Sequence, residues 1–122
     1  MKLEGPGLLL RVFVGESDRW EGAPLYEAVV RRARLKGLAG ASVFRGAEGF
    51  GANSRVHSTR LLRLSQDLPI LIEIVDREEA IRAFLPELDE MVGEGLATLE
   101  RVEVILYRRR SDSPGPKTDS PR

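Results

Sequence analysis

The sequence lacks cysteine and has a single histidine, and these shortages exclude several kinds of site. Among its 122 residues there is no Cys, and His57 is the sole His. Without thiols the chain has no disulfide framework, no thiolate-held metal and no Cys nucleophile. One imidazole does not make a zinc site either. We therefore expect no metal centre.

Long apolar runs and an excess of charge of one sign are also missing. The longest apolar stretches, such as residues 8–10 and 70–72, are far too short to span a bilayer. The first residues are not followed by the apolar stretch of a signal peptide. The chain has 19 Lys and Arg and 19 Asp and Glu, so its formal net charge is zero. This balance argues against a protein that coats nucleic acid without sequence specificity. We expect a cytoplasmic protein without direct membrane insertion.

The composition changes near residue 108. Residues 108–122 are mainly Arg, Ser, Pro and Asp, with no aliphatic or aromatic side chain. Such a segment cannot bury a core and is typical of a disordered tail, whose arginines are solvated or touch an anionic surface. We therefore expect one domain over residues 1–107, followed by this tail.

Hydrophobic periodicity, glycines and helix-start signals predict the element order βαββαβ. The predicted elements are a strand over 8–14, a helix between Pro24 and Gly37, a strand over 41–45, a third strand from 60–64 and 69–75, a helix after a capping box at 76–79, and a strand over 102–107. Pro86 is expected to kink or break the second helix. The order is that of a ferredoxin-like α+β sandwich, a four-stranded antiparallel sheet with two helices on one face.

This arrangement leaves one sheet face without helices, and that face is too apolar for an ordinary solvated surface. With the first strand between the third and fourth, Arg11 would lie between Glu73 and Glu103, and Val102 and Val104 would face the helices. A subunit interface is the sharper interpretation, and a sheet face with tolerated hydrophobes is the alternative. The predicted interface residues are Leu9, Arg11, Phe13, Leu71, Glu73, Glu103, Ile105 and Tyr107.

The most informative segment for chemistry spans residues 45–60. It combines three glycines with several arginines and one acidic residue. Glycine allows the positive φ that a nest of backbone N–H groups needs, and arginine matches phosphate, so the segment predicts a phosphate-bearing ligand. The alternative is a long hairpin whose glycines merely permit turns. The predicted binding residues are Arg45, Gly46, Gly49, Gly51, Asn53, Ser54, Arg55, His57 and Arg60.

A second cluster follows the first strand, where sites are often built on a rigid sheet. Trp20 either stacks on a base or covers the start of the first helix, and Phe50 is a second candidate for stacking. Glu16 and Asp18 either bind a metal or pair with Arg19, and two carboxylates alone are weak evidence for a metal. The residues expected to support the ligand or the loop are Glu16, Ser17, Asp18, Arg19, Trp20 and Phe50.

Five blocks in order carry a family resemblance: GESDRW at 15–20, PLYE at 24–27, GLAGA at 37–41, GFGANSR at 49–55 and LPILIEIVD at 68–76. Over residues 8–107 the chain resembles the family named domain of unknown function 190, in the PII-like (GlnB-like) superfamily. The resemblance implies a homotrimer with sheets facing inward. It also implies a signalling protein that binds an adenine nucleotide between subunits. We expect a non-enzymatic regulator that binds a nucleotide, with or without Mg²⁺, or another phosphate-bearing metabolite.

In that superfamily a flexible loop joins the second and third strands and contacts a target, often a transporter or enzyme. Residues 46–59 occupy this position and contain no Tyr, so control by uridylylation is not expected. Two other functions stay open. One is a small hydrolase of phosphoryl or acyl esters, with Asn53 or His57 positioning water. The other is an RNA-binding module, although residues 70–75 lack the aromatics that stack bases.

Overall fold

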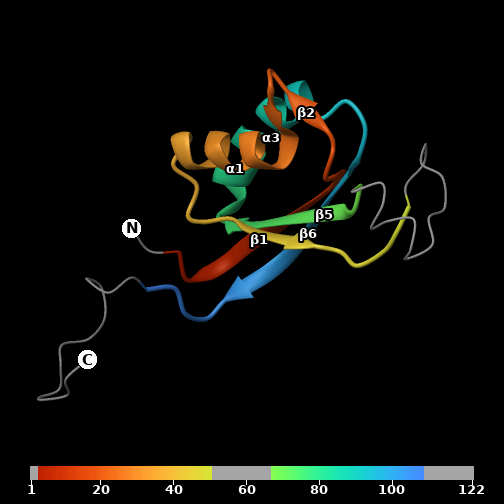
Figure 1. The fold of residues 1–122 in the computed structure, drawn as a ribbon. Helices are drawn as coiled ribbons and strands as arrows, with labels where there is room; N and C mark the ends of the chain where they lie inside the picture. The colour runs from red at the N-terminus through yellow and green to blue at the C-terminus, as the bar shows by residue number, and fades with distance from the viewer. Residues whose placement is uncertain (1–2, 51–66, 109–122) are drawn as a thin grey trace, which may run out of the picture.

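Two helices lie on one side of an antiparallel sheet in the computed structural model, which describes residues 3–50 and 67–108 (Figure 1). The strands are β1 (Gly5–Gly15), β2 (Arg19–Trp20), β3 (Ala23–Pro24), β4 (Ser42–Arg45), β5 (Pro69–Asp76) and β6 (Leu96–Val104). The helices are α1 (Leu25–Leu35) and α3 (Glu78–Met91). The predicted ferredoxin-like α+β fold is confirmed, with a short β2–β3 hairpin added before α1. Within the described part, no helix is long and apolar enough to cross a membrane.

The four-stranded sheet has the order β4-β5-β1-β6, so β1 is central and pairs with both β5 and β6. Side chains alternate between the two faces of a strand. Leu8, Leu10, Val12 and Val14 of β1 therefore point to the helices together with Ile70, Ile72 and Ile74 of β5, and all are buried. Helix residues Val29, Ile81 and Phe84 close this core from the other side. The predicted covered face is correct for these two strands.

Both helices begin and end close to the expected residues. Pro24 directly precedes α1, and Gly37 has a φ of +81°, the left-handed conformation common just after a helix. Helix α3 runs through Pro86 without a break, which corrects the expectation of a break there. Proline deprives the carbonyl four residues earlier of its donor. That residue, Arg82, is exposed, so water can replace the lost hydrogen bond.

The predicted capping box is wrong. Asp76 ends β5, and no side chain caps α3, which begins after Arg77. The Asp76 carboxylate is buried and accepts the backbone N–H of Ala39 at 2.9 Å and that of Arg77 at 2.7 Å. The Asp76 carboxylate therefore accepts a hydrogen bond from the connection between α1 and β4, and does not cap α3.

Strand β6 begins at Leu96, six residues before the predicted start, and ends at Val104. Its register places Thr98 opposite Arg11 and Glu103 opposite Pro6. Val102 and Val104 therefore share the face of Gly7, away from the helices, which reverses the prediction for both valines. The cause is Gly95, where a Cβ would lie 2.6 Å from the Phe13 carbonyl oxygen. Because Gly95 has no side chain, the backbone can approach β1 closely at this point, and pairing with β1 begins at the next residue, Leu96.

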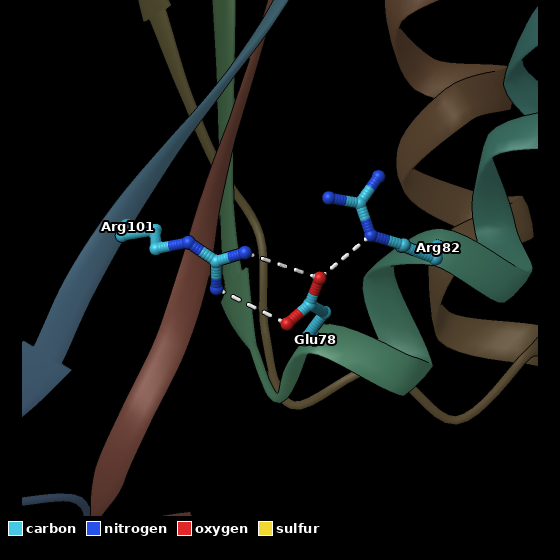
Figure 2. Close-up of polar contacts among 3 residues, drawn as sticks. All are labelled: Glu78, Arg82 and Arg101. Carbon is cyan, nitrogen blue, oxygen red and sulfur yellow. Dashed lines mark hydrogen bonds and ion pairs between the residues drawn. The ribbon is translucent and has the colours of Figure 1, made fainter.

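An ion-pair group fastens β6 to the N-terminal turn of α3 (Figure 2). Glu78 lies between two arginines, with Arg101 Nη1 3.1 Å from Oε1 and Arg82 Nε 2.8 Å from Oε2. These bonds, that of Arg101 first, lower the pKa of the Glu78 carboxyl. Arg101 belongs to β6, so its position confirms that this register turns the odd-numbered β6 residues toward the helix side.

Candidate functional site

The candidate site is built on a tight turn, residues 15–18, that ends the central strand β1. The backbone N–H of Gly15 donates to the Asp18 carboxylate at 2.9 Å, and the Asp18 N–H donates to the Gly15 carbonyl at 3.2 Å. The Asp18 carbonyl in turn accepts the N–H of Leu25, the first residue of α1, at 2.7 Å. The turn is therefore held by its own side chain and by the start of a helix.

Both ends of the segment between β4 and β5 are tied to the 15–18 turn. At the first end, Arg45 Nη2 donates to Glu16 Oε2 at 2.5 Å. At the second end, the Ser17 hydroxyl donates to Asp67 at 2.8 Å, and the Glu16 N–H donates to the Leu68 carbonyl at 2.8 Å. Figure 1 shows β4 ending and β5 beginning at the end of the sheet where β1 finishes. A change at this turn thus reaches both ends of the segment.

Gly46 and Gly49 do not adopt the positive φ that a nest requires, so the physical reason given for them is wrong. Each instead lies against the ring of Pro69. A Cβ on Gly46 would be 2.7 Å from Pro69 Cγ, and one on Gly49 would be 3.3 Å from it. The Gly46 N–H also donates to the Pro69 carbonyl at 2.7 Å. Because Gly46 and Gly49 have no side chain, the backbone can pack closely on Pro69, at the second end of the segment.

The described part of the site is more acidic than the sequence suggested. Glu16, Asp18 and Asp67 lie at the turn, and Arg45 contacts the first of them. The other predicted binding residues lie outside the described residues: Gly51, Asn53, Ser54, Arg55, His57 and Arg60. Among the described residues, no group of three or more His, Asp or Glu is arranged to hold a metal ion.

The structure separates Trp20 from the loop residues with which it was grouped. Trp20 packs on the core and lines a hollow of about 220 Å³ with residues of α1 and with Met91 of α3. No residue from 45–50 lines that hollow. Arg19 donates to the Gly22 carbonyl at 2.7 Å within the hairpin and does not pair with Glu16. Phe50 is exposed and remains available for stacking.

The uncovered sheet face carries a charged group surrounded by apolar side chains. Arg11 bonds Glu73 at 3.0 Å, as predicted, and its second partner at 3.0 Å is Glu100 and not Glu103. The bond to Glu73 contributes most to raising the pKa of Arg11. Around this group lie the apolar side chains of Leu9, Phe13, Leu71, Val75, Phe44, Leu96, Val102 and Val104. Phe44 is 49% exposed and Leu96 is 56% exposed, so this face is a large apolar surface.

Three of the predicted interface residues are misplaced. Glu103 belongs to the helix-side face because of the β6 register. Ile105 and Tyr107 lie beyond the end of β6 and are not paired in the sheet. The Tyr107 hydroxyl donates to the Ala39 carbonyl at 2.8 Å. Phe44 and Leu96 were not predicted to lie on this face, although Gly95 followed by an apolar residue marks the true start of β6.

Comparison with solved structures defines the class of fold. The chain is similar to CPII from Thiomonas intermedia K12 bound to ADP and bicarbonate, with a TM-score of 0.53 and 19% identity over 81% of this chain and 88% of that one. It is also similar to CPII bound to ADP, AMP and acetate, with a TM-score of 0.51 and 19% identity over 85% and 92% of the two chains. At this identity the likeness shows the fold, which is PII-like.

Sequence comparison then places the chain in a family. A family model matches residues 7–104, and the chain belongs to that family, DUF190, described as "Uncharacterized ACR, COG1993". A UPF0166 protein of Aquifex aeolicus is 43% identical over 97 residues, covering 80% of this chain and 91% of that protein. A UPF0166 protein of Methanocaldococcus jannaschii is 36% identical over 84 residues, covering 69% and 77%. The predicted family membership is confirmed.

Proposed function

We propose that this protein is a PII-like regulatory protein without enzymatic activity. It binds a nucleotide or another phosphate-bearing metabolite at clefts between subunits. It presents the 46–59 segment, of which the structure describes residues 46–50, to a target protein. The target is a transporter or an enzyme, as the resemblance to PII proteins implies. The first ligand to test is ADP, because the two CPII structures compared above are bound to it.

One observation supports this function above the others. Both ends of the segment between β4 and β5 are tied to the 15–18 turn, by Arg45 with Glu16 and by Ser17 with Asp67. A ligand that contacts Arg45 therefore acts on the base of the segment that would face the target. Binding energy spent there shifts the population of segment conformations, which is how a regulator passes on a signal.

The uncovered face supports assembly into a trimer. An apolar surface with Phe13, Phe44 and Leu96 exposed is unfavourable in water, and a second and third copy of the chain would cover it. Arg11 bonded to Glu73 and Glu100 would then be buried with its charge partners in place and would help to fix how the sheets meet.

A thermal-shift panel tests the proposed function. The wild-type chain is melted with ATP, ADP, AMP, guanine nucleotides and cyclic dinucleotides, with and without Mg²⁺. A ligand present at 100 times its Kd stabilises the native state by about 2.7 kcal/mol, which gives a clear rise in melting temperature. We expect ADP or a related nucleotide to produce this rise.

Two variants complete the design. Arg45→Gln should lose the rise relative to its own ligand-free melting temperature. Arg34→Gln removes an exposed charge of the same sign from α1, where it forms no ion pair with a described residue, and should keep the rise. A flat panel for the wild-type chain would contradict the proposed function. It would direct the search toward a protein partner alone.

A further inference from the structure

The Arg45 guanidinium is paired with a carboxylate of the 15–18 turn. Arg45 Nη2 lies 2.5 Å from Glu16 Oε2, and the Glu16 side chain is 22% exposed while that of Arg45 is 54% exposed. The Glu16 backbone is fixed, since its N–H donates to Leu68 at 2.8 Å. A backbone hydrogen bond thus holds the residue that carries the Glu16 carboxylate, and this carboxylate pairs with the partly exposed guanidinium of Arg45.

The turn that carries Glu16 is acidic. A Cβ placed on Gly15 would lie 3.0 Å from Asp67 Oδ1 and 3.4 Å from Asp18 Oδ1, so both carboxylates face the same point of the turn. Arg45 offsets part of this negative charge through Glu16. Moving the guanidinium onto another anion would leave the Glu16 carboxylate without this cation, which opposes the move.

We propose that Glu16 is a built-in competitor of the ligand phosphate for Arg45, and that this residue sets the affinity of the site. The inference rests on the proposed function and deepens it. A phosphate group that takes over the Nη2 donor of Arg45 displaces the Glu16 carboxylate, since both are anions that match the same guanidinium. The competition weakens phosphate binding and confines it to ligands with enough further contacts to offset the lost ion pair.

The exchange also identifies what the ligand changes in the protein. Arg45 is the last residue of β4, and Gly46–Pro69 pairing continues directly after it. When Arg45 turns to the phosphate, the first end of the segment loses its side-chain tie to the turn. The second end keeps its tie through Ser17 and Asp67. Ligand binding therefore removes the side-chain contact at the first end of the segment and leaves the contacts at the second end in place.

Isothermal titration of ADP into the full chain and its variants tests this competition. Glu16→Gln removes the charge of the competitor and keeps its size, and Glu16→Ala also removes the amide oxygen to which Arg45 could still donate a hydrogen bond. We expect both to bind ADP more tightly than the wild type, by about two- to fivefold, the range of a partly exposed ion pair. Arg45→Gln should bind ADP more weakly than the wild type.

The matched control is Glu79→Gln, which removes the same charge from an exposed position on the first turn of α3. That turn follows Asp76, at the end of β5 opposite to Pro69 and the candidate site. It should bind ADP with wild-type affinity. Wild-type binding of ADP with no gain in either Glu16 variant would overturn the competition and leave the proposed function standing. Absence of ADP binding in the wild type and in both Glu16 variants would instead count against the proposed function itself.

Discussion

The buried carboxylate of Asp76 accepts the backbone N–H of Ala39 at 2.9 Å, across 37 residues of sequence. The Ala39 carbonyl accepts the hydroxyl of Tyr107 at 2.8 Å. The connection between α1 and β4 is therefore held at one residue from two sides, by the end of β5 and by the segment after β6. This contact fixes where β4 enters the sheet and hence where Arg45 is placed at its other end.

Replacing Asp76 should cost stability because it leaves buried polar groups unpaired. Asp76→Ala removes the acceptor of two backbone N–H groups, and we expect a loss of about 1–3 kcal/mol in the free energy of unfolding. Urea unfolding followed by circular dichroism measures it. Asp89→Ala, at an exposed position of α3, is the control and should stay within about 0.5 kcal/mol of the wild type. Equal stability of the two variants would show that Asp76 is not needed.

Gly46 should be sensitive to a methyl group because of Pro69 and not because of its backbone conformation. Gly46→Ala would place Cβ 2.7 Å from Pro69 Cγ, closer than side chains tolerate, and we expect a loss of about 1–3 kcal/mol. Gly49→Ala, with 3.3 Å to the same atom, should lose less. In a Pro69→Ala background the penalty at Gly46 should shrink, and a double-mutant cycle from urea unfolding detects this. Strictly additive losses would exclude the contact as the cause.

Stability should fall in acid partly through Glu87, which joins the two helices. Its carboxylate bonds Lys36 at 2.8 Å and Arg32 at 2.5 Å, and these bonds, that of Lys36 first, lower the pKa of Glu87. A carboxyl whose pKa is lowered on folding stabilises the protein above its unfolded pKa and loses this contribution as the pH falls through the folded value. Glu87→Gln should therefore lose less stability than the wild type below about pH 5.

The measurement is the melting temperature from pH 7 downward. Glu90→Gln, at an exposed position of the same helix, should follow the wild-type curve. Parallel curves for Glu87→Gln and the wild type would contradict the assignment to Glu87.

Two neighbouring residues of β4 separate the two faces of the sheet. Phe44 pairs with Leu71 on the uncovered face, and Val43 pairs with Ile72 on the helix side. If copies of the chain meet through the uncovered face, Phe44→Asp places a charge in the interface and should dissociate the assembly. Val43→Asp should leave it intact. Size-exclusion chromatography with light scattering at micromolar concentration decides this, and equal masses for the two variants would argue against that interface.

The sequence was sufficient for the parts of the fold that rest on local pattern. Alternation in β1 and β5 and the apolar stripe of α3 predicted the core, because burial on one face imposes those periods. Contacts between distant residues were not predictable in the same way. Asp76 looked like a helix cap because its partner, Ala39, is remote in sequence. The β6 register depended on the close approach of Gly95 to Phe13, which no periodicity reveals.

The site followed the same division. The 15–18 turn and the glycines of the 46–49 segment could be predicted, since charged residues and glycines stand out in composition. The glycines were assigned to an anion nest, whereas Gly46 and Gly49 allow close packing on Pro69. The ion pair between Glu16 and Arg45 could not be predicted, because charge pairing across 29 residues depends on how β1 and β4 are placed.

Sedimentation velocity of the wild-type chain with ADP, recorded at 260 and 280 nm, tests the central claim most directly. Three chains of 13.6 kDa give an assembly of about 41 kDa. The account predicts that ADP absorbance moves with a protein boundary of that mass. A boundary with the mass of a monomer would contradict it, and so would a trimer boundary that carries no ADP absorbance.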